Sequence, residues 1–184
     1  MAYDYQTVHA LEGTIGAVSE RRANHLSVHR ASAIASVLAA PGRAAEAAGI
    51  LVASGEFEAR FVAPGEWLVL SDVHAPETLG AELSVRLGDF AFVVDQSHGR
   101  VALTIAGPDA ARILANGIGA DLHIDAFPVG RAANVLCNHL SVNLARTGGD
   151  RFGIVVTRSF AGALVDDLKV MARSHELSVD FDTR

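Results

Sequence analysis

Cysteine and lysine are almost missing from this chain. Cys137 is the single cysteine among 184 residues, and Lys169 is the single lysine among 15 basic residues. One cysteine excludes an internal disulfide framework and a zinc site built from several cysteines. The preference for arginine over lysine we attribute to genomic composition rather than to function.

The chain also lacks a net positive charge and a long apolar run. Lysine and arginine total 15 against 21 acidic residues, a formal net charge of -6. No overall positive field is therefore present to attract nucleic acid or an anionic membrane. No apolar run approaches the ~18 residues of a membrane-spanning helix, and charges interrupt the first ~30 residues, where a signal peptide needs an apolar segment. We expect no nucleic-acid partner, no membrane and a cytoplasmic location.

What is present is enough apolar sequence for a packed core. Half of the residues are hydrophobic and 20% are charged, which excludes wholesale disorder. The length suits one domain, or two small halves packed as one. We expect residues 1–25 to form an N-terminal extension. Residues 26–184 are expected to form a single unit made of two repeats, 26–96 and 97–184.

Two long stretches of the chain share one apolar pattern. Residues 64–95 match residues 149–180 without a gap after a shift of 85 positions, which places Phe92 on Leu177. An earlier pair, residues 34–50 and 101–118, shares a short apolar run, a Gly/Pro break and an Ala-rich helical stretch. The common order of the two pairs indicates an internal duplication.

Each half is predicted to run strand, helix, strand, strand, helix, strand. Glu58 and Arg60 alternate with apolar neighbours, the period of a half-buried strand. Asp72 is expected to cap the second helix, and Thr157 or Ser159 the last helix, which should end at residue 174. The fold class is α+β, with two fused ferredoxin-like βαββαβ repeats. The strands are expected at 34–39, 57–61, 67–70, 90–95, 101–105, 140–144, 152–156 and 177–181.

Common catalytic signatures are missing from the sequence. It has no G-x-G-x-x-G, no Walker loop, no G-x-S-x-G and no H-E-x-x-H. His25 and His29 could share a helix face and hold a metal, but no third ligand has a suitable spacing, and solvated or capping histidines are the favoured interpretation. Cys137 beside His139 could form a thiolate pair, although a lone cysteine among apolar residues favours a core position. We predict no catalytic, cofactor-binding or metal-binding residue.

The most unusual stretch is a polar run between two apolar strands, at residues 95–100. One interpretation is an inter-repeat turn whose aspartate and arginine pair internally, and the other is contact with a ligand or a partner protein. A second polar cluster opens the last helix, where free N–H groups and Arg158 could receive an anion, with a simply capped helix start as the alternative. The candidate partner-interface residues are Asp95, Gln96, Ser97, His98, Arg100, Arg158, Ser159 and Phe160.

The segment VDQSHGRVALTIAGPDAARILANG, residues 94–117, resembles the family that contains the aminomethyltransferase of the glycine cleavage system. That family shows a D-x-S-H turn, then a strand, then G-P-D-A opening a helix. With residues 64–72, 121–130 and 150–164, the sequence is more similar to the gamma-subunit family of heterotetrameric sarcosine oxidase. The resemblance covers about residues 26–175 and implies a folate-binding-domain-like fold.

The resemblance also implies partner proteins. In such a complex, sarcosine (N-methylglycine) or a related N-methyl amino acid is oxidatively demethylated. The family places FAD, FMN, NAD and tetrahydrofolate on other subunits, and its members assemble with alpha, beta and delta subunits. The gamma subunit is expected to hold no cofactor of its own.

The sequence departs from the aminomethyltransferase pattern in two ways. It lacks the further domain that frames a folate pocket, and residues 136–141 carry no carboxylate where that family has an acidic loop. We therefore expect a non-catalytic structural subunit. A stand-alone folate-dependent aminomethyltransferase-like protein is the alternative, and a small-ligand module using the cleft between the repeats is a third hypothesis.

Overall fold

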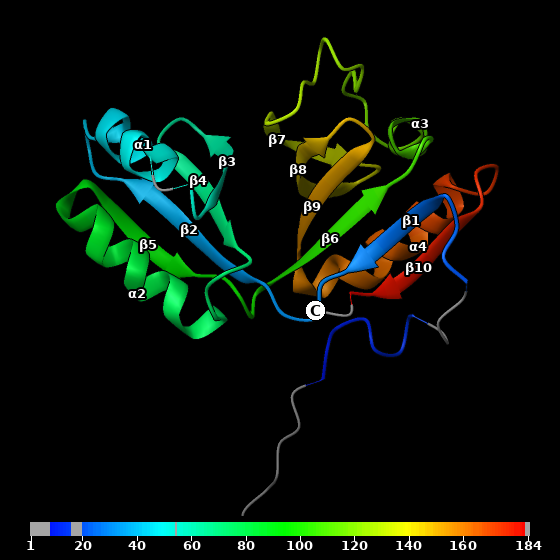
Figure 1. Ribbon diagram of the computed structural model, residues 1–184, viewed down its shortest axis with the longest axis horizontal. Coiled ribbons are helices and arrows are strands. Elements are labelled where there is room, and N and C mark those ends of the chain that lie inside the picture. Colours follow the sequence, from blue (N-terminus) through cyan, green and yellow to red (C-terminus); the bar gives the residue numbers. More distant parts are fainter. Residues whose placement is uncertain (1–7, 16–19, 54, 183–184) are drawn as a thin grey trace, which may run out of the picture.

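The computed structural model describes residues 8–15, 20–53 and 55–182. Within these ranges the strands form two sheets, a four-stranded sheet of order β3-β4-β2-β5 and a six-stranded sheet of order β10-β1-β6-β9-β8-β7 (Figure 1). No helix in the described ranges is long and apolar enough to cross a membrane. The elements are β1 (Asn24–Val28), β2 (Ala33–Ala39), α1 (Ala44–Ala53), β3 (Glu58–Ala63), β4 (Glu66–Ser71), α2 (Pro76–Leu87), β5 (Ala91–Asp95), β6 (Arg100–Ala106), α3 (Ala110–Ala115), β7 (Ala132–Cys137), β8 (Leu140–Gly148), β9 (Arg151–Thr157), α4 (Ala161–Met171) and β10 (Leu177–Phe181).

The first unit is one contiguous ferredoxin-like repeat. Its elements follow the order β2, α1, β3, β4, α2, β5, and every pair of neighbouring strands in its sheet is antiparallel. The apolar sides of both helices pack on one face of the sheet, with Leu51, Leu79 and Leu83 in the core. The predicted βαββαβ repeat is confirmed here.

The second unit repeats this pattern with two added strands. β6, α3, β8, β9, α4 and β10 supply the repeat, and β7 extends one edge of the sheet. The other addition is β1, which lies between β6 and β10, antiparallel to the first and parallel to the second. We expected residues 24 and 25 in an N-terminal extension and 26–28 in the first repeat. They lie instead in the second sheet, with Leu26 and Val28 fully buried in its core.

Asn24 anchors β1 to the start of α3. Its side-chain amide donates to the carboxylate of Asp109 at 3.2 Å and to the carbonyl of His175 at 2.7 Å, and its side-chain oxygen accepts from the Asp109 N–H at 2.9 Å. The bond from Asn24 holds the pKa of Asp109 below its usual value. Gly107 permits this approach, because its φ of +136° and the carbonyl of Ala23, 2.4 Å from where a Cβ would lie, exclude a side chain.

The two units meet through the faces of their sheets that carry no helices. Ile34, Leu68 and Leu70 of the first unit pack with Ala102 and Val155 of the second. The two units diverge from a common base at which β2, β5 and β6 converge (Figure 1). Each sheet therefore has a helix-covered face and an inner face directed at the other unit.

Two helix caps and one helix end differ from the prediction. α2 begins at Pro76 with Ala75 as its N-cap and no side-chain cap, so Asp72 does not cap it. α4 begins at Ala161 after a 3-10 turn and also lacks a side-chain cap, which makes the prediction for Thr157 or Ser159 wrong. The helix ends at Met171 rather than at residue 174. Pro76 at the start of α2 has no N–H to cap, and α4 continues directly from the 3-10 turn at residues 158–160.

The gapless match between the halves fails in their last strands. Phe92 is 63% exposed on the inner face of β5, whereas Leu177 packs against the core of the second unit. Ala91 and Val93 are the β5 residues that face the helices. The last strands are therefore related by a shift one residue larger than the 85 positions that relate the preceding segments. A one-residue shift changes the face on which every side chain lies.

Candidate functional site

A cleft of about 400 Å³ lies between the two units. The first unit contributes the loop before β3, the start of β3 and the end of β4, and the second contributes β6, the end of β8 and the start of β9. Apart from His29, which was considered as a metal ligand, sequence reasoning did not single out these residues as candidate site residues. The polar lining comprises His29, Ser32, Glu56, Glu58, Arg60, Ser71, Asp72, Thr104, Thr147 and Arg151.

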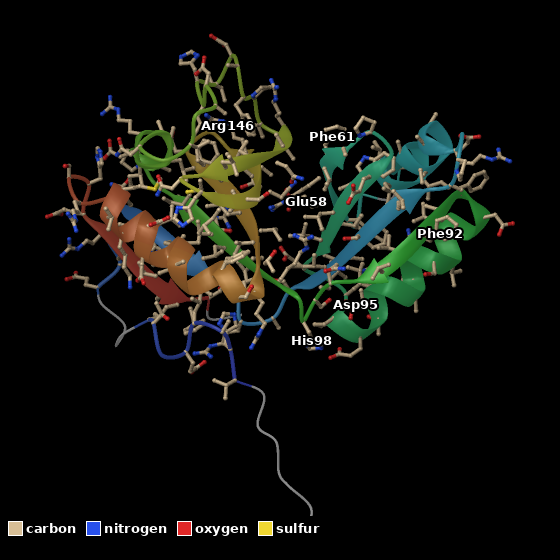
Figure 2. All side chains as sticks on the ribbon, turned by 180° about the vertical axis from the view of Figure 1, so that it is seen from behind. Glu58, Phe61, Phe92, Asp95, His98 and Arg146 are labelled. Atoms are coloured by element: carbon tan, nitrogen blue, oxygen red, sulfur yellow. The ribbon has the colours of Figure 1, made fainter. Side chains whose placement is uncertain are left out.

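An ion pair between Glu58 and Arg60 dominates the cleft. The guanidinium of Arg60 donates two hydrogen bonds to the Glu58 carboxylate, both at 2.9 Å, and Arg60 is only 4% exposed. Gly153 of β9 faces this guanidinium, and a Cβ there would lie 2.4 Å from Nη2 of Arg60. Figure 2 shows Glu58 between the two units. The charged face of β3 thus turns toward the second unit, and the pair neutralises the charge that burial would otherwise disfavour.

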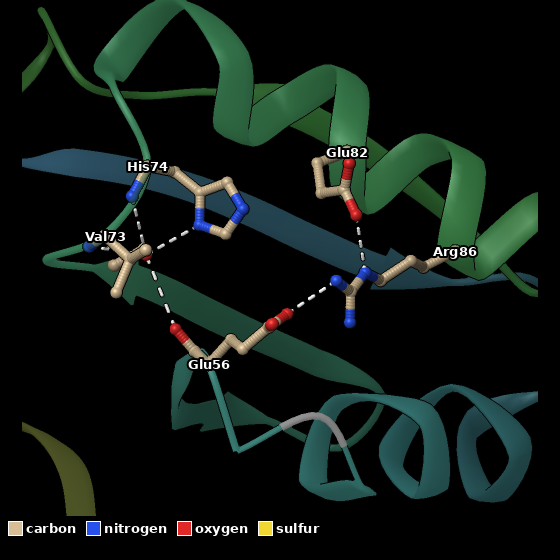
Figure 3. Close-up of polar contacts among 6 residues, drawn as sticks. Glu56, Val73, His74, Glu82 and Arg86 are labelled. Atoms are coloured by element: carbon tan, nitrogen blue, oxygen red, sulfur yellow. Dashed lines mark hydrogen bonds and ion pairs between the residues drawn. The ribbon is translucent and has the colours of Figure 1, made fainter.

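A polar network fixes the first-unit rim of this cleft (Figure 3). The Ser71 hydroxyl accepts from the N–H groups of Val73 and His74 at 3.2 Å each and donates to the Glu56 carbonyl at 3.4 Å. Arg86 on α2 bridges Glu56 at 2.5 Å and Glu82 at 2.7 Å. The loop before β3 is therefore tied to both α2 and the β4–α2 connection.

The predicted interface residues gather at the base of the molecule. The N–H of Arg158 donates to the carbonyl of Gly99 at 2.9 Å, which joins the inter-unit turn to the start of the last helix. Ser97, His98, Arg100 and Arg158 line one cavity of about 350 Å³. Figure 2 places Asp95 and His98 at this base. Asp95, Gln96, Ser159 and Phe160 lie outside the lining, and Ser159 and Phe160 are exposed.

The inter-unit turn is held by bonds within it and to β2. The Asp95 carboxylate accepts from the N–H and hydroxyl of Ser97 at 2.9 and 2.7 Å, and these bonds lower the pKa of Asp95. The N–H of Ile34 donates to the Ser97 oxygen at 3.0 Å, and the N–H of Gln96 donates to the Ile34 carbonyl at 2.8 Å. Asp95 thus binds Ser97 in place of the expected pairing with Arg100. Contact of these residues with a partner stays a prediction.

Cys137 is a core residue. Its side chain is 1% exposed, its sulfur lies 4.0 Å from that of Met171, and burial raises the pKa of the thiol to about 11. His139 follows in an exposed turn. A protonated, buried thiol is a poor nucleophile, so the core interpretation of Cys137 is the one that the geometry favours.

We expect the native protein to resist thiol reagents. At pH 8 a thiol of pKa about 11 is about 0.1% ionised, so 5,5′-dithiobis(2-nitrobenzoate) should react about 100-fold more slowly with native protein than with protein in 6 M urea. The control is Cys137→Ala, which should not react in urea. A native rate within tenfold of the denatured rate would contradict the buried position of the thiol.

His25 is buried and structural. It is 3% exposed, its Nδ1 lies 2.7 Å from the Ser178 hydroxyl and its Nε2 lies 2.8 Å from the Asp180 carboxylate. The solvated or capping role expected for it is wrong. The three groups have the residue types of a catalytic triad, but Ser178 is itself 3% exposed and offers no substrate access. The described parts of the chain contain no group of three side chains able to hold a metal.

His29 is half-buried and lines the cleft. Its Nε2 lies 2.9 Å from the Thr104 hydroxyl. Burial lowers its pKa, against the opposing effect of Asp182. The cleft thus contains the imidazole of His29, which is neutral at neutral pH, and the Glu58–Arg60 ion pair, which has no net charge.

Comparison with known proteins identifies a family. The model described as "Sarcosine oxidase, gamma subunit family" matches residues 27–171. The chain is 37% identical over 103 residues to a sarcosine oxidase subunit gamma of Corynebacterium sp. strain P-1, covering 54% of this chain and 49% of that protein. It is 31% identical over 134 residues to the corresponding subunit of strain U-96, covering 72% and 62%. The matched regions thus span about half to three-fifths of the length of these relatives.

Solved structures agree in fold. A chain of heterotetrameric sarcosine oxidase from Corynebacterium sp. U-96, solved with pyrrole 2-carboxylate, superposes with a TM-score of 0.71 at 27% identity, covering 90% of both chains. Aminomethyltransferase T of the glycine cleavage system from Bartonella henselae superposes with a TM-score of 0.60 at 18% identity, covering 88% of this chain and 48% of that one. The second likeness shows the fold alone, and it confirms the predicted folate-binding-domain-like class.

Proposed function

The chain belongs to the sarcosine oxidase gamma subunit family, and from that premise we propose that it is the gamma subunit of a sarcosine-oxidase-type flavoenzyme complex. The complex oxidatively demethylates sarcosine or a related N-methyl amino acid. The observation that carries the proposal is the superposition on a chain of a heterotetrameric sarcosine oxidase over 90% of both chains. Such coverage is what a subunit of the same kind of assembly would give.

The proposed partners are alpha, beta and delta subunits. FAD, FMN, NAD and tetrahydrofolate belong on those subunits, and this chain contributes structure rather than chemistry. Two features support a structural role. Arg60 in the cleft is neutralised by Glu58, and the thiol of Cys137 is buried and protonated. We propose a cytoplasmic location for the assembly.

Co-purification tests the proposal. An affinity-tagged chain is expressed in its host, the tagged material is isolated, and co-purifying proteins are identified by mass spectrometry. We expect large subunits, a flavin absorbance and sarcosine-dependent oxidation in the purified complex, together with a colourless and inactive chain when it is expressed alone. An unrelated tagged protein of similar acidity is the control.

The outcomes separate this function from its alternatives. A chain that purifies alone from its host, without a flavoprotein, would count against the subunit function. Tetrahydrofolate titrated into the isolated chain separates the transferase alternative, because calorimetric heat of binding and aminomethyl transfer are expected only from a folate-dependent enzyme. The subunit function predicts neither.

A further inference from the structure

The cavity at the base of the molecule is basic although the chain is acidic overall. The cavity has a volume of about 350 Å³. Its lining includes three arginines, Arg30, Arg100 and Arg158, and two carboxylates, Glu12 and Glu77. The whole chain carries a formal net charge of -6. Arginines thus converge at one point of a molecule whose average charge is negative, which focuses a positive potential in this cavity.

Two of these arginines have no carboxylate partner among the residues that the structure describes. Arg30 pairs with Glu12 at 3.4 Å, whereas the Arg158 guanidinium donates to a backbone carbonyl, that of Val8, at 2.6 Å. The Nε atom of Arg100 is buried without a hydrogen-bond partner. Within the described residues, neither Arg100 nor Arg158 lies within ion-pair distance of an acidic side chain. Their charge is therefore available to an anion from outside the chain.

The arginines also act on the neighbouring His9. Burial lowers the pKa of His9, and the charges of Arg158 and Arg30 lower it further, against the opposing effect of Glu12. His9 is therefore neutral at neutral pH. The positive charge that an anionic group would meet in this cavity is the charge of the arginines.

We propose that this cavity is the docking site for an acidic side chain of a partner subunit, whose carboxylate is bound by Arg100 and Arg158. The inference rests on the proposed function and specifies where and by which chemistry the subunit binds. Arginine suits the role because its planar guanidinium matches the geometry of a carboxylate and donates paired, charge-assisted hydrogen bonds.

The surroundings of the cavity favour a protein occupant over a free anion. Val8 at the cavity is 57% exposed, and Phe160, two residues after Arg158, is 48% exposed. Exposed apolar side chains beside unpaired charges are typical of a surface that a protein covers, because a partner buries the apolar area while it neutralises the charge. A small anion would leave both apolar side chains in water.

Charge-removal variants test the inference in the assembled complex. The double variant Arg100→Gln/Arg158→Gln should bind the other subunits about 30-fold more weakly than the wild type, because a carboxylate would be left buried without a partner. Binding of the wild type should weaken with added salt more steeply than binding of the variant. The matched control is Arg173→Gln, an exposed arginine outside the cavity, and its affinity should equal that of the wild type.

Further variants keep the result interpretable. The single variant Arg100→Gln retains the bond between Arg158 and Val8, so a weaker affinity there cannot come from loosening of the N-terminal residues. Arg100→Lys/Arg158→Lys, which keeps the charge, should recover part of the lost affinity. The urea midpoint of each variant shows whether it folds, and the affinities are compared only among variants with midpoints like that of the wild type.

The failures of the two proposals are distinguishable. A wild-type chain that binds no other subunit would overturn the proposed function, and this inference with it. Wild-type binding with a double-variant affinity within twofold would overturn this inference alone. Titration of acetate and inorganic phosphate into the isolated chain tests the alternative that the cavity binds a small free anion. If one of these anions binds the wild type with a sub-millimolar Kd and does not bind the double variant, while the double variant still assembles with the other subunits like the wild type, the cavity is a small-anion site. That result would overturn the docking role.

Discussion

Replacing Gly107 with alanine should lower the free energy of unfolding by about 2–4 kcal/mol. The residue has a φ of +136°, and an added Cβ would lie 2.4 Å from the Ala23 carbonyl and 2.6 Å from the side-chain oxygen of Asn24. Ala23 directly precedes β1 and Asn24 is its first residue, so neither contact can give way without moving the strand. Urea unfolding followed by circular dichroism measures the effect.

The matched control for this substitution is Gly149→Ala. Gly149 lies in the β8–β9 turn, and an added Cβ there would meet nothing within 4 Å. We expect a change of less than about 1 kcal/mol in the control. Equal effects of the two substitutions would mean that the close approach of residue 23 to Gly107 does not hold β1 in place.

The second large effect is expected from Leu26→Ala. Leu26 is fully buried on β1 within the core of the second unit, and removing its side chain should cost about 2–5 kcal/mol through lost burial and a residual cavity. The urea midpoint should fall accordingly, while the slope of the transition should stay unchanged if unfolding remains two-state.

Ser27→Ala is the control on the same strand. Ser27 pairs with Thr104 across β1 and β6, and its side chain is only half-buried on the inner face. We expect a change of about 0.5 kcal/mol or less. If Leu26→Ala is as mild as this control, β1 is an appendage that the second unit can lose. A large difference between the two variants makes the strand part of the core.

The repeat architecture could be predicted because its signal is local. Alternation in strands and i, i+4 spacing in helices can each be recognised within a few consecutive residues. Leu79 and Leu83 accordingly lie on the buried side of their helix, as expected. In β1 the alternation is confined to Leu26 and Val28, too short a run to assign the strand to a sheet. The strand is five residues long, and His25 is satisfied by Ser178 and Asp180, about 150 residues farther along the chain. Partners at that distance cannot be found from spacing.

The cleft was missed for a different reason. Alternation correctly put Glu58 and Arg60 on the polar face of β3, but it cannot say whether water or another sheet covers that face. The second unit covers it, and Arg60 is buried there. Phe92 shows the reverse case, an apolar residue that the repeat matched with Leu177 but that is exposed on the inner face. Which face of a strand meets which neighbour depends on tertiary packing.

The junction between the units could be recognised in the sequence because five polar side chains there lie between two apolar strands. The fold then added what spacing could not show. Arg158 lies against Gly99, and Arg30 from the segment after β1 reaches the same cavity. The candidate interface residues therefore form a three-dimensional cluster, and their contact with a partner is the part that awaits experiment.

The pairing of β1 with β10 constrains the order of events during synthesis. His25 and Ser178, which meet across these strands, are separated by 153 residues. At ~5–20 residues per second, a ribosome needs roughly 8–30 s to make the intervening chain. The first unit can close meanwhile, because its strands and helices are consecutive in the chain. β1 can pair with β6 earlier, but its other edge stays unpaired until β10 emerges. In that interval the open edge is a natural target for chaperones or for aggregation.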